Sequence, residues 1–123
     1  MSDEADGSAA DGHSVAPAEA VELIAAGATL VDVRRPYEYE GGHLPGAVNI
    51  EMNELPARSA EIARDRPVLF YCRSGNRSSM AVDAFREAGY DAQNLAGGIA
   101  AWHADGRALE PDGGEVRAPL PAS

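Results

Sequence analysis

A short apolar run in the middle of the chain constrains the fold more than any other feature. Residues Val68–Tyr71 are all apolar or aromatic, and the turn-forming segment Cys72–Ser78 follows them directly. A strand without polar residues on either face is typical of a parallel sheet that is covered by helices on both sides. The run therefore predicts a central parallel strand, with the segment Cys72–Ser78 beginning where that strand ends.

Strand and helix patterns alternate on both sides of this run. Further strands are expected at Thr29–Val33, Ala47–Ile50 and Tyr90–Leu95. Helices are expected from Pro17 to Gly27, from Asn53 to about Arg64, from Ser78 to about Ala88, and from Gly98 through Trp102. This alternation predicts an α/β fold with an open, mainly parallel sheet of about five strands and helices on both faces.

The length of 123 residues suits one domain. Residues 1–13 are rich in acidic and small residues and are expected to form a disordered acidic tail. Pro, Gly and charged residues from 107 onward predict a flexible C-terminal extension over 107–123. The folded domain is therefore expected to span residues 14–106.

The charge and cysteine content exclude several classes of function. The net charge is −10 and every positive charge is an arginine, which argues against a nucleic-acid partner. No stretch approaches the ~20 apolar residues of a membrane span, and no secretory signal is apparent, so no membrane partner is expected. A single cysteine forms no internal disulfide, lacks the partners of a structural zinc site and fits a reducing compartment, which predicts a cytoplasmic protein without a bound metal.

The lone cysteine lies at the predicted strand end, where open parallel sheets bind ligands. The helix that follows places roughly half a positive charge at its N-terminus, which lowers the pKa of a nearby thiol. Arg73 and Arg77 are close in sequence, and no acidic residue occurs between Pro67 and Val82. Cys72 is therefore interpreted as a reactive thiolate with an anionic substrate. The alternative is a buried structural cysteine, but its place at a strand end favours the nucleophile.

Two segments outside the loop Cys72–Ser78 are expected at the same edge of the sheet, namely Asp32–Pro36 and Leu95–Ile99. Asp32 could accept hydrogen bonds from backbone donors of the reactive loop, and Arg34 could pair with Glu38 or Glu40. His43 could serve as a base, although a thiolate stabilised by a helix dipole needs none, so a structural role is favoured.

The second segment contains paired glycines. Gly97 and Gly98 follow the strand predicted to end at Leu95, and such a pair indicates a tight turn. Trp102, four residues further on, is expected in the core.

Three motifs together resemble the rhodanese family of sulfurtransferases in its single-domain form. They are Asp32-Val33-Arg34 through Glu38 with Gly42–Ile50, the loop Cys72–Ser78, and Leu95–Ile99 with Trp102. The resemblance extends over about residues 15–106, with all three motifs in order. It implies a rhodanese-like domain at 14–106.

The resemblance implies a persulfide mechanism. Cys72 would take a sulfane sulfur from a small donor such as thiosulfate and pass it to cyanide, a thiol or an acceptor protein such as a thioredoxin-like thiol. The implied substrate-binding residues are those of the loop: Arg73, Ser74, Gly75, Asn76, Arg77 and Ser78. Asp32 and Arg34 would support the loop, and no metal or organic cofactor is implied.

The sequence leaves three alternatives open. One is a persulfide carrier or regulatory module that uses the same cysteine without independent turnover. A phosphatase or arsenate reductase on the same fold is less favoured, because four residues separate Cys72 from Arg77 and the phosphate loop of such enzymes resembles a longer C-x5-R motif. A non-catalytic binding module would be expected to have lost the cysteine.

Overall fold

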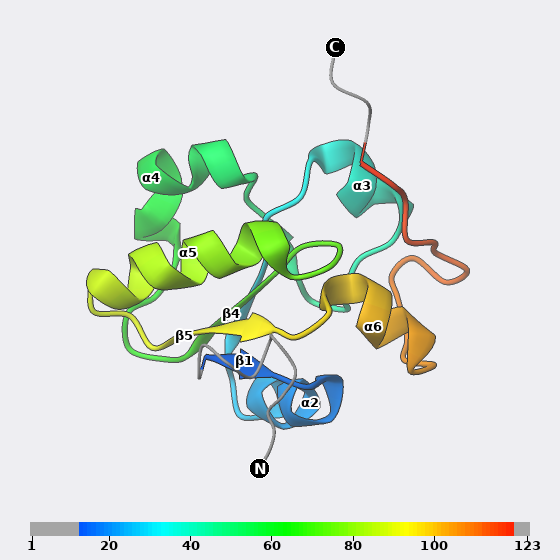
Figure 1. Cartoon of the computed structure of the whole chain (residues 1–123), viewed down its shortest axis with the longest axis horizontal. Helices are drawn as coiled ribbons and strands as arrows, with labels where there is room; N and C mark the ends of the chain where they lie inside the picture. Colours follow the sequence, from blue (N-terminus) through cyan, green and yellow to red (C-terminus); the bar gives the residue numbers. More distant parts are fainter. Residues whose placement is uncertain (1–12, 120–123) are drawn as a thin grey trace.

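Strand β4, Val68–Tyr71, lies inside a five-stranded sheet in the computed structural model, which describes residues 13–119 (Figure 1). The strand order is β1-β5-β4-β2-β3, and every pair is parallel. The other strands are β1 (Ser14–Val15), β2 (Thr29–Asp32), β3 (Val48–Asn49) and β5 (Ala92–Leu95). The predicted open parallel sheet is thereby confirmed, with one short edge strand, β1, that was not foreseen.

Side chains of β4 alternate between two separate cores. Val68 and Phe70 join a cluster on one face, together with Cys72 just beyond the strand. Leu69 and Tyr71 join a cluster on the opposite face. Because both faces of β4 are buried, its sequence has no polar position.

Helices cover the two faces of the sheet (Figure 1). Their bounds are α2 Pro17–Ala25, α3 Pro36–Gly41, α4 Leu55–Arg58, α5 Asn76–Glu87 and α6 Gly98–Ala104. Helices α4 and α5 contribute to the first core, and α2 and α6 to the second. None of the helices within residues 13–119 is long and apolar enough to cross a membrane.

The prediction of one continuous helix from Asn53 to about Arg64 is wrong. The segment contains two 3₁₀ turns, Met52–Glu54 and Ser59–Glu61, on either side of the single turn of α4, and Asn53 lies inside the first of them. Ile62 leaves the helix with φ −103° and ψ 118° and is only 2% exposed. Burial of Ile62 in the core therefore ends the helix early.

Local signals explain two further differences. Helix α3 begins at Pro36, which suits the first turn of a helix because proline lacks an N–H, yet six residues are too few for a clear periodic pattern. Helix α5 begins at Asn76 instead of Ser78, because Gly75 takes the left-handed conformation (φ 102°) directly before it.

The chain beyond Gly106 packs against α3 and the loop that follows it. Leu109 is buried, and Glu110 exchanges two backbone hydrogen bonds with His43 at 2.8 and 2.9 Å. Further on, the N–H of Glu115 donates to the carbonyl of Gly41 at 2.8 Å. Within the described residues, the extension expected to be flexible over 107–123 thus contributes Leu109 to the core and backbone hydrogen bonds to His43 and Gly41. Residues 1–12 and 120–123 of the two expected tails lie outside the described residues.

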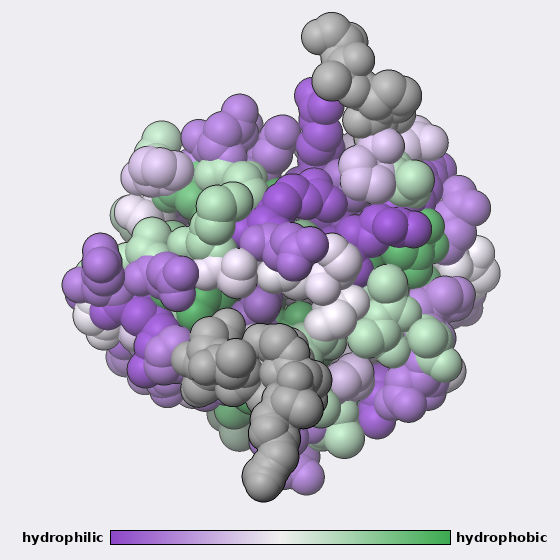
Figure 2. All heavy atoms as spheres, in the orientation of Figure 1, coloured by the Kyte–Doolittle hydropathy of each residue, from purple (hydrophilic) through white to green (hydrophobic). Residues whose placement is uncertain are grey.

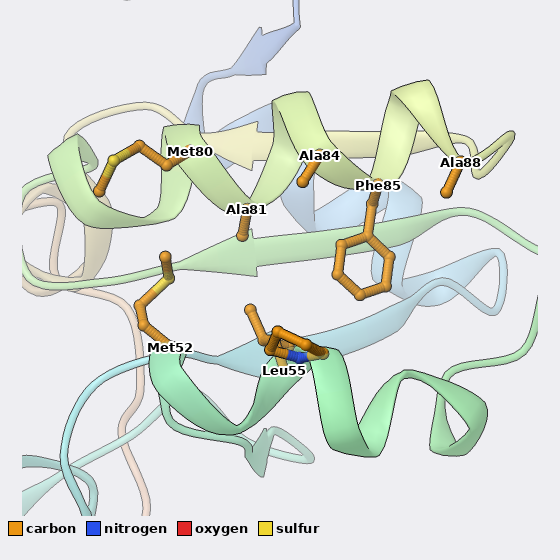
Figure 3. Close-up of a pocket in the computed structure, with 8 residues that line it drawn as sticks. Met52, Leu55, Met80, Ala81, Ala84, Phe85 and Ala88 are labelled. Carbon is orange, nitrogen blue, oxygen red and sulfur yellow. The ribbon is translucent and has the colours of Figure 1, made fainter.

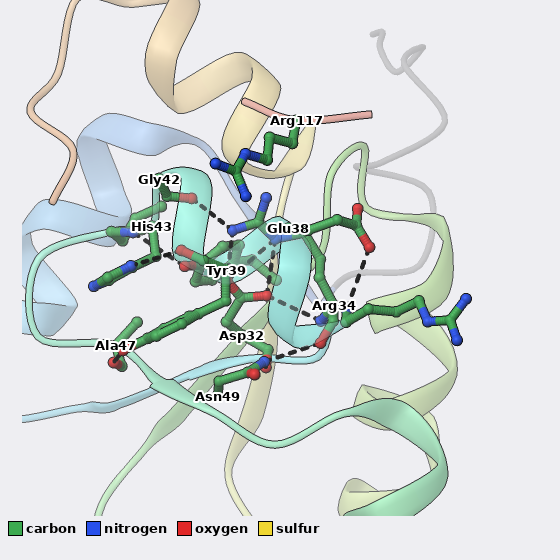
Figure 4. Close-up of polar contacts among 12 residues, drawn as sticks. Asp32, Arg34, Glu38, Tyr39, Gly42, His43, Ala47, Asn49 and Arg117 are labelled. Atoms are coloured by element: carbon green, nitrogen blue, oxygen red, sulfur yellow. Dashed lines mark hydrogen bonds and ion pairs between the residues drawn. The ribbon is translucent and has the colours of Figure 1, made fainter. Parts of the chain in front are cut away.

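A buried ion pair fixes the end of β2 (Figure 4). Arg34 pairs with Asp32, with Nη2 and Oδ2 2.7 Å apart, and both side chains are fully buried. The same Nη2 donates to the carbonyl of Gly42 at 2.8 Å. The expected pairing of Arg34 with Glu38 or Glu40 is therefore wrong. The expected bond from Asp32 to the reactive loop is also wrong, because its carboxylate accepts from the backbone and side chain of Arg34.

Replacing Asp32 with Ala is expected to destabilise the protein strongly. The change leaves the Arg34 guanidinium buried without its carboxylate, and such a loss costs about 3–5 kcal/mol in free energy of unfolding. Urea denaturation measures it. Glu54→Ala, which breaks the exposed pair between Arg58 and Glu54, is the control and should change stability little. A loss below about 1 kcal/mol for Asp32→Ala would contradict the importance of the pair.

Candidate active site

Cys72 lies at the carboxyl end of β4 and is 1% exposed. Its Sγ accepts a hydrogen bond from the backbone N–H of Gly75 at 3.1 Å and lies 3.4 Å from Oγ of Ser78. Both residues belong to the start of α5, where backbone N–H groups without helical partners carry partial positive charge. The structure thus places the sulfur at a helix N-terminus, as the sequence predicts.

The polar surroundings of the sulfur oppose the effect of its burial. Burial disfavours the charged thiolate and by itself raises the pKa of Cys72. Hydrogen bonds from the Ser78 side chain and from the backbone of Ser78, Gly75 and Ser74 outweigh it, so the pKa of Cys72 lies below that of an ordinary thiol. A purely structural cysteine needs no such donors, and the alternative of an inert buried thiol is disfavoured.

Gly97 and Gly98 bring α6 against the loop Cys72–Ser78. The backbone N–H groups of Ile99 and Ala100 donate to the carbonyls of Cys72 and Arg73, each at 3.0 Å. A Cβ atom on Gly98 would lie 2.5 Å from both of these carbonyl oxygens. Gly98 is therefore required for close approach of two backbones, which is a stricter demand than the tight turn expected from the sequence.

Arg77 is bound to a buried carboxylate from another element. Its Nη1 and Nη2 lie 3.2 and 3.1 Å from the two oxygens of Glu38 in α3, and Glu38 is fully buried. The hydrogen bond to Glu38 raises the pKa of Arg77, and the nearby charge of Cys72 contributes in the same direction. The loop therefore has no acidic residue near it in the sequence, but in the folded protein the carboxylate of Glu38 contacts it.

The remaining loop residues face solvent. Arg73, Ser74 and Asn76 are exposed, and the Arg73 side chain forms no ion pair with any other residue in the described range. Arg73 is thus the cation of the loop that is free to meet an anion. Across residues 13–119 there is no group of three His, Cys, Asp or Glu side chains placed to hold a metal ion.

His43 and Trp102 make contacts that hold neighbouring segments of the fold together. The His43 ring stacks on Tyr39 at 3.8 Å between centroids, and its Nδ1 lies 2.9 Å from the carbonyl of Tyr39 (Figure 4). The indole N–H of Trp102, which is 6% exposed, donates to the carbonyl of Ala108 at 2.8 Å. His43 is therefore held by α3 rather than directed at Cys72.

Two contacts with the loop were not predicted from the sequence. Glu38 pairs with Arg77, and Asn94 of β5 bonds to both Gly75 and Ser78. Asn94 is a buried amide at the end of an interior strand, which is an unusual residue type there and is the signal that points to it. Glu38 was expected to pair with Arg34, and its actual partner, Arg77, lies 39 residues away in the sequence.

An apolar groove runs between α5 and the α4 segment (Figure 3). Its volume is about 290 Å³, and Met80, which is 60% exposed, stands at one end. The lining residues carry no charge: Met52, Leu55, Pro56, Met80, Ala81, Ala84, Phe85 and Ala88. The groove therefore offers no charged side chain to an anion.

Ser78→Ala is expected to raise the pKa of Cys72, because it removes a donor to the thiolate. One such hydrogen bond corresponds to a three- to tenfold fall in the thiol ionisation constant, as a rough estimate. Ultraviolet absorbance of the thiolate during a pH titration measures this. Ser79→Ala is the matched control, since the Ser79 hydroxyl donates to the carbonyl of Asn76 at 2.8 Å. An unchanged titration in Ser78→Ala would contradict the role of this hydroxyl.

Comparison with known proteins agrees with this geometry. The family model of the Rhodanese-like domain matches residues 16–105. A Bacillus subtilis protein named uncharacterized protein YqhL is 45% identical over 76 residues, covering 61% of this chain and 60% of that protein. An Allochromatium vinosum protein named sulfurtransferase is 46% identical over 74 residues, covering 59% of this chain and 69% of that protein. A rhodanese-related protein from Thermoplasma volcanium has a crystal structure that superimposes with a TM-score of 0.75 at 32% identity, covering 79% and 96% of the two chains. The chain belongs to the rhodanese-like domain family.

Proposed function

We propose that this protein is a sulfurtransferase that carries sulfane sulfur as a persulfide on Cys72. The observation that carries the proposal is the set of donors around Sγ, which lowers the pKa of a thiol that burial alone would raise. A thiolate is the form that attacks sulfur. The relative named sulfurtransferase supports this chemistry for the family.

The proposed reaction has two displacement steps. The Cys72 thiolate attacks the outer sulfur of a donor such as thiosulfate, a new S–S bond forms, and sulfite leaves with the electron pair of the broken bond. An acceptor then attacks the outer sulfur of the persulfide, and Cys72 leaves as a thiolate. The acceptor that we propose is cyanide, a small thiol or a thioredoxin-like protein thiol. No external oxidant or reductant is consumed in either step.

The loop supplies positive potential at both steps. The donors of Gly75 and Ser78 meet the sulfur of Cys72, and further backbone N–H groups of the loop are available to the outer sulfur. We assign the binding of the donor anion to Arg73, because its guanidinium is exposed. Arg77, paired with Glu38, is assigned to holding the loop in place.

Asp32 and Arg34 support the loop through α3. Their ion pair ties the end of β2 to Gly42, directly after the helix that carries Glu38. We therefore propose an indirect role for both, in place of the direct contact expected for Asp32.

The phosphatase alternative is weakened by the same geometry. Only four residues separate Cys72 from Arg77, and the Arg77 guanidinium is engaged by both oxygens of Glu38. Phosphoryl transfer of this kind needs an arginine that clamps the phosphate oxygens.

A persulfide carrier without turnover of its own differs from an enzyme only in the second step.

Incubation of the reduced protein with thiosulfate is expected to add the mass of one sulfur atom to Cys72. Subsequent cyanide should release thiocyanate and restore the original mass, both measured by mass spectrometry and a colorimetric assay. Cys72→Ser should lose both reactions while keeping its circular dichroism spectrum. Failure of the reduced thiol to gain sulfur would contradict the proposal, and release of phosphate from an aryl phosphate would support the rival. Persulfide without repeated turnover would indicate a carrier.

Arg73→Ala and Arg77→Ala are expected to differ in kinetics. Loss of Arg73 should raise the KM for thiosulfate by about tenfold or more with little change in kcat, because it removes a charged contact to the substrate. Loss of Arg77 should lower kcat and the melting temperature as well, because Glu38 remains buried without a cation. Arg66→Ala is the control, since Arg66 precedes β4 at the opposite end of the strand. An effect on KM from Arg77→Ala alone would reverse the two assignments.

A further inference from the structure

Asn94 connects the two groups that touch the reactive sulfur. It lies in β5, is 4% exposed, and uses both ends of its amide. Nδ2 donates to the carbonyl of Gly75 at 3.1 Å, and Oδ1 accepts from the hydroxyl of Ser78 at 2.6 Å. Gly75 and Ser78 are also the residues whose N–H and Oγ contact Cys72.

The chemistry of these partners fixes the direction of each bond. A carbonyl oxygen only accepts, so the Asn94 amide nitrogen must face Gly75 and its oxygen must face Ser78. The Asn94 oxygen also only accepts, so the Ser78 hydroxyl donates its proton to it. A hydroxyl has one proton, and it therefore serves either Asn94 at 2.6 Å or the Cys72 sulfur at 3.4 Å, but not both at once.

We propose that Asn94 is a positioning residue that holds the Ser78 hydroxyl proton while the Cys72 sulfur is uncharged, and releases it to Sγ when that sulfur becomes a thiolate. The inference rests on the proposed sulfurtransferase function. In the neutral thiol, the S–H donates to Oγ of Ser78 and the Ser78 hydroxyl donates to Asn94. When Sγ carries charge, the hydroxyl rotates and donates to Sγ. No proton leaves Ser78 in either state.

This competition places Asn94 in the sulfur-transfer cycle. In the persulfide, the negative charge lies on the outer sulfur, so the hydroxyl proton stays with Asn94. When an acceptor removes the outer sulfur, charge returns to Sγ and the hydroxyl turns to meet the leaving thiolate. An attacking thiol works best when its pKa is near the ambient pH, and a competing acceptor for the Ser78 proton keeps the thiolate from being stabilised too strongly.

Arg77 and Gly75 also interact with Cys72, and neither depends on Asn94 alone for its position. Arg77 interacts with the Cys72 charge, but its guanidinium is held by Glu38 in α3 and not by Asn94. The Gly75 carbonyl also accepts from the N–H of Ser79 at 3.2 Å, so it keeps a partner when the Asn94 side chain is replaced. An effect of Asn94 on the thiol is therefore expected to pass through Ser78.

The test is a thiolate titration of four proteins: the native chain, Asn94→Leu, Ser78→Ala and the double variant. Leucine has the branched shape of asparagine without its hydrogen bonds and suits a buried strand. Asn94→Leu frees the Ser78 proton for the thiolate, so the ionisation constant of Cys72 should rise about three- to tenfold. In the Ser78→Ala background the same change should have almost no effect, because the hydroxyl that couples the two sites is gone.

A fall in the ionisation constant on Asn94→Leu, or an equal change in both backgrounds, would overturn the proposal. Asn94→Val is the second variant, because it also suits a strand and removes the acceptor for the Ser78 proton, so it should raise the ionisation constant as Asn94→Leu does. An unchanged or lower ionisation constant in Asn94→Val would also contradict the switch. Thermal unfolding verifies that each variant is folded. The titration needs no sulfur donor. A failure of persulfide formation would therefore overturn the proposed function without changing the result expected for Asn94.

Discussion

Burial of the Cys72 sulfur is the constraint on which the site depends. A thiol that is 1% exposed ionises only if donors replace the water that it lost. The N–H of Gly75 and the hydroxyl of Ser78 provide this replacement, and both require α5 to begin directly after the loop. The conformation of the loop therefore decides whether this cysteine is an inert core residue or a nucleophile.

Neighbouring elements hold that conformation from three sides. From α6, backbone N–H groups bind the carbonyls of Cys72 and Arg73, and only a glycine at position 98 allows the approach. From β5, Asn94 binds the carbonyl of Gly75. From α3, a buried carboxylate binds the last arginine of the loop. These elements meet because the carboxyl ends of parallel strands share one edge of the sheet.

The parts that the sequence predicts well are those set by local pattern. The strand Val68–Tyr71 is apolar throughout because each of its faces is buried, and the loop after it is marked by a cysteine and turn-forming residues. Pairings between distant segments could not be predicted in the same way. Arg77 binds Glu38, which lies 39 residues away in the sequence, and only the packing of α3 beside the loop brings the two side chains together. Asn94 likewise acquires its contacts from the register of β5 beside β4.

The most direct measurement of the central claim is a crystal structure of the protein after exposure to thiosulfate. Electron density for one additional sulfur is expected, bonded to Sγ of Cys72 inside the loop and within hydrogen-bond reach of the loop's backbone N–H groups. An unmodified sulfur, or an oxyanion held in the loop without a covalent bond to Cys72, would contradict the persulfide mechanism.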